Sequence, residues 1–250
     1  MSDTLYNNLI NYVKTVVENN NLTNFKSNVT DIFEHVSYEL GQQYIDCIKK
    51  YSVLSTDQII SYCKKNDMYG GGKKYDYGWI TTSPTNFRYL LHSHIILTHI
   101  KSQDQHETNI VEIGCGYGGL CLAILELSHF YGVTINEYHL IDLPDINLLQ
   151  KLYLSNFSFT TKLLFHSAYT YGHNITTTNL FLISNYCFSE IDSEHQKRYI
   201  SQLFPKVSHG FMTWNHILFY DFGFKVNIEE EYPLTSYNPN NELNNKYISF

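Results

Sequence analysis

Short apolar runs alternate with longer segments of helical periodicity from residue 109 onward. The short runs have the length of strands, and in the longer segments apolar residues recur every three to four positions. The predicted strands are 109–113, 138–143, 162–167, 180–185, 210–214, 224–230 and 246–250, and the predicted helices are 118–130, 144–154 and 193–203. Strands that alternate with helices predict a mainly parallel sheet with helices on both faces, which is an α/β fold.

The first hundred residues follow a different pattern and indicate mainly helix. Apolar residues recur at helical spacing in two segments. These are Leu5, Ile10, Val13, Val16 and Val17, followed by Val29, Ile32, Phe33, Val36 and Leu40. A third helix is predicted over 56–65, and a fourth begins with Ser83 as N-cap and Pro84 in its first turn. The sequence therefore predicts a helical region over 1–104 ahead of an α/β region over 105–250.

Composition and charge narrow the class of protein. The chain has 250 residues, of which 43% are hydrophobic, enough for a sizeable core. Its formal net charge is −7 and it has no long run of Lys or Arg, which argues against a nucleic-acid substrate. The five Cys are odd in number and form no CxxC pair, so we expect reduced thiols. The lack of a signal peptide and of an 18-residue apolar stretch predicts a soluble, cytoplasmic protein that does not bind membranes.

A glycine-rich segment follows the first predicted strand, where residues 111–119 read VEIGCGYGG. Gly114 and Gly116 allow a tight turn beneath a ligand, and the following helix offers free amide groups at its start. The glycines also fit the GxGxxG spacing, so a dinucleotide such as NAD is an alternative ligand. S-adenosylmethionine is favoured because Glu112 is a charged residue within an apolar strand, where a cationic aminopropyl group would pair with it. The extra Gly118 brings the loop closer to a ligand that lacks a pyrophosphate.

An acid two residues before GxGxG resembles the first motif of class I S-adenosylmethionine-dependent methyltransferases. The resemblance implies a Rossmann-like sheet of seven mostly parallel strands, with an acid after the second strand that receives the ribose hydroxyls. Asp142 occupies that place, and a carboxylate can accept a hydrogen bond from both hydroxyls. Two alternatives are that Asp142 only caps the helix that begins near Pro144, and that it serves an NAD enzyme. The cofactor-binding residues implied are Arg88, Glu112, Gly114, Cys115, Gly116, Asp142, Leu143, Ser167 at the adenine edge, and Asn185.

Four further strings are similar to those of the sugar O-methyltransferases of glycan biosynthesis. They are SPTNFRY at 83–89, IDLP at 141–144, SNYCFSE at 184–190 and TWNH at 213–216. This resemblance covers about residues 65–220 and implies methyl transfer to a hydroxyl of a sugar, either a nucleotide-activated or a glycan-terminal deoxyhexose. We expect the helical region over 1–104 to form a cap over the acceptor site.

A sugar hydroxyl is a poor nucleophile at neutral pH, so a general base is expected near the transferred methyl group. In sheets of this type ligands bind at the carboxyl ends of the strands. Glu190 and His216 follow the fourth and fifth predicted strands, and both are candidates for the base. The alternatives are that Glu190 clamps the substrate or caps the following helix, and that His216 has a surface or structural role. Asn185 and Tyr186 are expected to border the methyl-transfer site, and Tyr186 and Asn215 to contact the substrate, with core packing as the alternative for Tyr186.

Arg88 is one of only two arginines in the chain. It is expected to pair with the cofactor carboxylate, with Glu112 or with a phosphate of a nucleotide sugar, and the alternative is an ordinary surface ion pair. The fourth predicted strand ends in Ser184 and Asn185 without a pair of carboxylates, so a metal-independent enzyme is predicted. The three histidines of the helix after Pro84 lack Cys or carboxylate partners at ligand spacing, which favours packing over a zinc site.

Three other functions remain open. A methyltransferase acting on nucleic acid or protein is the nearest, but residues 185–188 read NYCF and lack the two prolines of the amino-group enzymes of DNA. A nicotinamide-dependent oxidoreductase is supported only by the glycine spacing. A non-catalytic subunit that binds the cofactor for stability is the third. Titration with S-adenosylhomocysteine and with NAD separates a methyltransferase from a nicotinamide-dependent oxidoreductase.

Overall fold

The computed structural model describes residues 3–103, 107–233 and 244–250. Its contacts divide the chain into two compact units. The first, called here the helical unit, comprises Met1–Thr98, Gly116–Tyr131 and Pro144–Phe159. The second, called the sheet unit, comprises His99–Cys115, Gly132–Leu143 and Thr160–Phe250. Each unit is described by itself.

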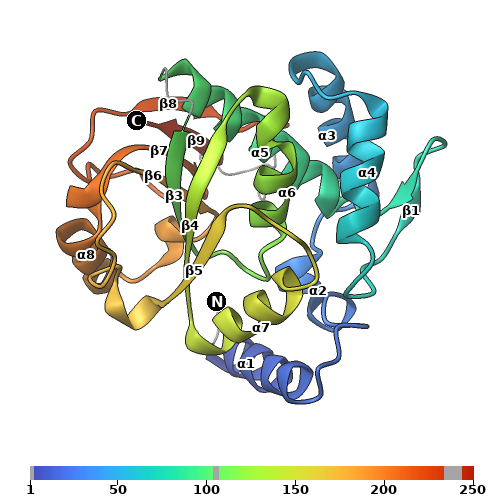
Figure 1. Cartoon of the computed structure of the whole chain (residues 1–250), viewed down its shortest axis with the longest axis horizontal. Coiled ribbons are helices and arrows are strands. Elements are labelled where there is room, and N and C mark those ends of the chain that lie inside the picture. Colours follow the sequence, from blue (N-terminus) through green and yellow to red (C-terminus); the bar gives the residue numbers. More distant parts are fainter. Residues whose placement is uncertain (1–2, 104–106, 234–243) are drawn as a thin grey trace. The chain divides into compact units, whose positions relative to one another are not determined.

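The sheet unit contains a seven-stranded sheet in the described part of the chain, with the order β5-β4-β3-β6-β7-β9-β8 (Figure 1). The strands are β3 (Glu107–Ile113), β4 (Thr134–Asp142), β5 (Lys162–Ser167), β6 (Leu180–Asn185), β7 (Val207–Trp214), β8 (Asn227–Glu230) and β9 (Lys246–Ser249). Strands β3 to β7 are parallel, and β9 is antiparallel to both of its neighbours. The predicted α/β class with a Rossmann-like, mostly parallel sheet is confirmed.

Strand β3 lies at the point where the strand order reverses. From β3 the chain adds β4 and β5 on one side and then β6 and β7 on the other. In open sheets of this kind ligands bind outside the carboxyl ends of the strands at that switch point. The candidate site is therefore expected at the ends of β3, β4 and β6.

The core of the sheet unit explains why its strands are nearly continuous apolar runs. Residues of β3 that alternate in direction, such as Ile110 and Val111, are both fully buried, as is typical of central strands in parallel sheets. Helix α8 (Ser193–Gln202) adds Tyr199 to a cluster with Phe188 and Trp214. Three short 3₁₀ turns complete the unit, namely η3 (Ala168–Thr170), η4 (Phe188–Glu190) and η5 (Phe204–Lys206).

The helical unit contains α1 (Asp3–Glu18), α2 (Thr30–Phe33), α3 (Tyr38–Tyr51), α4 (Thr56–Asn66), α6 (Gly119–Leu127), α7 (Pro144–Leu154) and most of α5 (Thr85–Ser102). The two-residue strands β1 (Tyr75–Asp76) and β2 (Thr81–Thr82) pair as a hairpin, and η1 (Ser27–Val29) and η2 (Ser128–Tyr131) are 3₁₀ turns. Helix α4 begins with a complete capping box between Ser55 and Gln58. None of the described helices is long and apolar enough to cross a bilayer.

Several predicted boundaries are corrected by the structure. The apolar pattern over 29–40 is not one helix, because the chain is non-helical over 34–37 and Ser37 caps a new helix, α3. Four strands differ from their predicted starts: β3, β4 and β7 begin earlier and β8 begins later. The helix predicted over 118–130 ends as α-helix at Leu127. The predicted loop over 236–245 lies mostly outside the described residues, and the boundary at residue 104 stays a prediction.

A buried polar cluster organises the interior of the helical unit around Asn66, which is fully buried. Its side chain bonds to Asn86 and Tyr153 and receives Lys26 Nζ at 3.1 Å. Its Nδ2 also donates to the hydroxyl of Tyr117 at 3.0 Å. Burial lowers the pKa of Lys26 to about 8, and its ammonium lies 4.7 Å from the centre of the Tyr117 ring. The cluster thereby holds Tyr117, a residue of the glycine-rich segment, against α4 and α7.

Candidate cofactor and acceptor site

The glycine-rich segment turns directly after β3, as predicted. Gly114 has φ +76° and donates its amide to Ile141 O of β4 at 3.0 Å. A Cβ on Gly114 would overlap the side chain of Cys187. Both its backbone angle and this close approach require glycine. The turn therefore brings the segments after β3 and β6 into contact within the sheet unit.

The chain passes from the sheet unit to the helical unit between Cys115 and Gly116. Gly116 and Gly118 also have positive φ angles, of +53° and +95°. Gly118 is the N-cap of α6, so the strand–turn–helix context predicted for this motif is present. Within the helical unit, Gly116 O accepts a hydrogen bond from Gln150 Nε2 of α7 at 2.8 Å.

Glu112 is a buried carboxyl group at the end of β3, with 2% of its surface exposed. Its Oε2 accepts a hydrogen bond from Tyr138 of β4 at 2.7 Å. Burial raises the pKa of Glu112 to about 7, although the Tyr138 hydroxyl opposes this shift. Cys115 donates its thiol to Glu112 O at 3.2 Å, within the turn. A group with this pKa ionises readily when a cation binds beside it.

Asp142 is the last residue of β4 and is buried. Because Ile113 and Ile141 are partners in the β3–β4 register, Gly114 and Asp142 are the next residues of two neighbouring strands. Asp142 Oδ1 accepts the amide of Leu143 at 2.9 Å. Its partner in β5 is Ser167, whose hydroxyl accepts the amide of Tyr169 and so begins η3. The structure thus places the predicted ribose acid beside the glycine turn.

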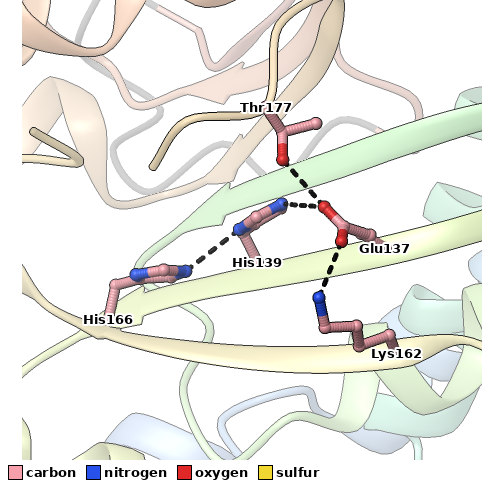
Figure 2. A network of polar contacts seen from close by, with 5 residues as sticks. All are labelled: Glu137, His139, Lys162, His166 and Thr177. Carbon is pink, nitrogen blue, oxygen red and sulfur yellow. Dashed lines mark hydrogen bonds and ion pairs between the residues drawn. The ribbon is translucent and has the colours of Figure 1, made fainter. Parts of the chain in front are cut away.

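A polar network that was not predicted from the sequence joins β4, β5 and Thr177, which precedes β6 (Figure 2). Glu137 accepts hydrogen bonds from Lys162 at 3.0 Å and Thr177 at 2.8 Å, which lower its pKa to about 2. The ionised carboxylate only accepts, so His139 Nε2, 3.2 Å away, carries a proton. His139 Nδ1 then accepts from His166 Nε2 at 3.0 Å. This chain of bonds fixes the ring of His166, next to Ser167 at the end of β5.

The residues after β6 form a second group at the same edge of the sheet. Asn185 Oδ1 accepts the hydroxyl of Thr213 in β7 at 2.8 Å. Tyr186 follows with φ +54°, a conformation that L-residues rarely adopt and that occurs at functional sites. Its hydroxyl bonds to the carboxylate of Glu231, which is 1% exposed and also accepts from Asn245 Nδ2 at 2.9 Å. Tyr186 therefore has a polar partner in the interior, and its expected place beside the acceptor stays a prediction.

Glu231 and Asn245 were not identified from the sequence. Glu231 is the third of three consecutive glutamates, and the two before it, Glu229 and Glu230, are exposed. Nothing local distinguishes the buried carboxylate from its solvated neighbours. Only the antiparallel pairing of β8 with β9 brings it beside Asn245, whose carbonyl accepts the Glu231 amide at 3.1 Å.

The two candidate bases have different surroundings. Glu190 is exposed, and one of its carboxylate oxygens accepts a hydrogen bond from Asn215 Nδ2. Asn215 is 7% exposed, and its amide N–H bonds to Ser189 Oγ at 3.2 Å. Helix α8 is capped by Asp192 rather than by Glu190, so the capping alternative for Glu190 is wrong. His216 is half-buried and follows Asn215.

Arg88 belongs to the helical unit and is 7% exposed, so an ordinary surface ion pair is wrong for it. Its guanidinium lies 2.6 Å from His35 Nε2. The charge of Arg88, followed by burial, lowers the pKa of His35 to about 3. His35 is therefore a neutral acceptor for Arg88. Its expected role toward the cofactor or a phosphate stays a prediction.

The described residues contain no group of three or more His, Cys, Asp or Glu side chains arranged to hold a metal ion. The histidines of α5 are instead buried or contact neighbouring side chains. Burial lowers the pKa of His92 to about 3, and His94 Nδ1 lies 2.8 Å from the Tyr131 hydroxyl. Packing accounts for both rings.

No family model and no curated protein matches the chain. Among solved structures, it is similar to an S-adenosylmethionine-dependent methyltransferase from Clostridium acetobutylicum, with 14% identity over 49% of each chain and a TM-score of 0.39. The chain thus spans about half the length of that protein. It is also similar to the methyltransferase domain of bacterial CtHen1-CN, with 10% identity, a TM-score of 0.47 and coverage of 64% of this chain and 96% of that one.

A third similar structure is a proposed caffeoyl-CoA O-methyltransferase from Staphylococcus aureus. The identity is 12% and the TM-score 0.48, with 84% of this chain and 97% of that chain covered. Likenesses as distant as these do not assign an activity, because one fold supports many functions.

Proposed function

We propose that this protein is an S-adenosylmethionine-dependent O-methyltransferase that methylates a hydroxyl of a sugar. One observation carries the proposal. Glu112, the Gly114 turn and Asp142 lie together at the carboxyl ends of β3 and β4, beside the switch point of the sheet. A buried carboxyl group, a glycine turn and a second carboxylate match the ammonium, the close backbone approach and the ribose of S-adenosylmethionine.

The cofactor supplies a methyl group already activated on a sulfonium, so the protein's part is binding, orientation and proton removal. Asp142 would accept hydrogen bonds from the ribose hydroxyls, and ionised Glu112 would pair with the ammonium. Cys115, Leu143 and Ser167 would border the cofactor at the ends of β3, β4 and β5. The roles of Gly116 and Arg88, in the helical unit, remain as predicted from the sequence.

The acceptor hydroxyl must lose its proton as the methyl group is transferred. Of the two candidate bases we favour Glu190, because Asn215 orients its carboxylate at the end of β7. His216 is the alternative. The sugar acceptor, its nucleotide-activated or glycan-terminal form and independence from metal are parts of this proposal that rest on the sequence strings at 83–89, 141–144, 184–190 and 213–216.

Calorimetric titration of the purified protein with S-adenosylhomocysteine tests the cofactor assignment, with NAD as the control. We expect micromolar binding of S-adenosylhomocysteine and none of NAD. Absence of S-adenosylhomocysteine binding would remove the proposed function, and binding of NAD alone would favour the oxidoreductase alternative.

The raised pKa of Glu112 makes cofactor affinity dependent on pH. Only the carboxylate attracts the ammonium, so affinity for S-adenosylhomocysteine should increase by about tenfold between about pH 5.5 and pH 7.5. The same raised pKa makes the stability of the unliganded protein decrease, rather than increase, as the pH rises. The folded state holds this proton more tightly than the unfolded state, so the stabilisation is present below pH 4.5 and is lost as pH rises through about 7.

Isothermal calorimetry and thermal unfolding at several pH values check both trends. Glu112→Gln should flatten them, whereas Glu107→Gln, at the exposed start of the same strand, should not. Equal pH dependence in the wild type and in Glu112→Gln would contradict the pairing of Glu112 with the ammonium.

A further inference from the structure

Two side-chain amides at the ends of β6 and β7 each leave one buried atom without a hydrogen-bond partner among the described residues. These atoms are Asn185 Nδ2, a donor, and Asn215 Oδ1, an acceptor. The great majority of buried polar atoms in native proteins are paired, so such an exception calls for an explanation. A ligand bound at the carboxyl edge of the parallel sheet would supply the missing partners.

The other atoms of both amides are held in place. Asn185 Oδ1 accepts the hydroxyl of Thr213 at 2.8 Å, and Thr213 is its partner in the β6–β7 register. Asn215 Nδ2 donates to Glu190, and its backbone amide donates to Ser189 Oγ at 3.2 Å. These bonds orient a free N–H of Asn185 and the carbonyl of Asn215 before any ligand binds.

The required ligand chemistry follows from the two orphaned atoms. An ammonium group only donates and would leave Asn185 Nδ2 unpaired. A phosphate or carboxylate only accepts, would leave Asn215 Oδ1 unpaired and would meet the like charge of Glu190. Hydroxyl groups both donate and accept, so two neighbouring hydroxyls satisfy both amides and remain compatible with the carboxylate.

We infer that Asn185 and Asn215 bind two neighbouring hydroxyl groups of a neutral acceptor. One hydroxyl accepts from Asn185 Nδ2 and the other donates to Asn215 Oδ1. This inference rests on the proposed function and adds to it two specificity-determining residues and the hydrogen bond that each makes to the acceptor. It also reassigns Asn185 from the cofactor, where its sequence position had placed it, to the acceptor.

The test is a double-mutant cycle between protein and acceptor. The full chain is supplied with radiolabelled S-adenosylmethionine and a panel of neutral monosaccharides and nucleotide sugars, together with amino, carboxylate and nucleobase acceptors. The best acceptor is then compared with its monodeoxy analogues in the wild type and in the Asn185→Asp and Asn215→Leu variants. Asn185→Asp keeps an oxygen that accepts the hydrogen bond from Thr213 and removes the Nδ2 donor. If the buried charge of that variant prevents folding, Asn185→Ser is used in its place. Asn136→Asp, an exposed asparagine of β4, is the matched control.

In the wild type, removal of either of two neighbouring hydroxyls should lower kcat/KM by about tenfold or more, as expected for a hydrogen bond in a buried site. Each variant should lose the discrimination at one of these hydroxyls only, with affinity for S-adenosylhomocysteine within about twofold of the wild type. Undiminished discrimination in both variants would overturn the inference. If the protein binds S-adenosylhomocysteine but methylates only amino, carboxylate or nucleobase acceptors, the inference is also overturned. The same holds if it binds S-adenosylhomocysteine and methylates no acceptor of the panel. Failure to bind S-adenosylhomocysteine would instead refute the proposed function.

Discussion

Glu190→Gln should lower the turnover number by about 10²- to 10⁴-fold while affinity for S-adenosylhomocysteine stays within about twofold of the wild type. Glutamine has the same shape, and its carbonyl can still accept the hydrogen bond from Asn215. It cannot accept the proton that the acceptor hydroxyl must lose. The measurement is the rate of radiolabelled methyl transfer to the best acceptor, with calorimetry for cofactor affinity.

Two further variants locate the base. Glu194→Gln changes an exposed glutamate of α8 that pairs with Arg198, and turnover should stay near that of the wild type. His216→Ala should lower turnover far less than Glu190→Gln. If turnover survives in Glu190→Gln and is lost in His216→Ala, the base is His216 instead.

Asp142→Ala should weaken binding of S-adenosylhomocysteine by at least about tenfold and leave the fold intact. Charge-assisted hydrogen bonds to the two ribose hydroxyls contribute roughly 1.5–3 kcal/mol each, and alanine removes both. Asp142 lies at the carboxyl end of β4, and its carboxylate accepts a hydrogen bond from the backbone amide of Leu143. Loss of that bond affects stability rather than cofactor specificity, so calorimetry and thermal unfolding separate the two contributions.

Asp145→Ala is the matched control, because Asp145 is also acidic, follows β4 within three residues and forms an ion pair with Lys14 at 3.8 Å. Its affinity for S-adenosylhomocysteine should equal that of the wild type. Unchanged affinity in Asp142→Ala, or equal losses in the two variants, would show that Asp142 does not bind the ribose.

The parts of the site that could be predicted from sequence are those set by neighbours along the chain. Gly114 lies in a turn that requires a positive φ, which glycine adopts easily. Asp142 is the last residue of its strand, where the apolar run ends. Parallel pairing of two such strands brings their ends together automatically, since both carboxyl ends face the same edge. Glu112 was recognisable because a charged residue in an apolar run needs a reason.

Other features could not be predicted, because they depend on residues far apart in sequence. Tyr186 and Glu231 are 45 residues apart, and His139 and His166 are 27 apart. The break between α2 and α3 was also not predicted. Ser37 caps α3, and Glu34, at the end of α2, bonds through its carboxylate to the hydroxyl of Ser83. Periodicity within residues 29–40 carries no information about that partner.

The sequence by itself determined the α/β class, the order of strands and helices, the glycine turn and the two carboxyl groups beside it, because period, turn chemistry and charge are local properties. Only the tertiary structure decided which polar side chains are buried and which of their atoms are satisfied. It separated Glu231 from Glu229 and Glu230, buried Arg88 beside His35 and left one atom each of Asn185 and Asn215 for a ligand. Burial and pairing are properties of the packed chain, since they are set by side chains that only folding brings together.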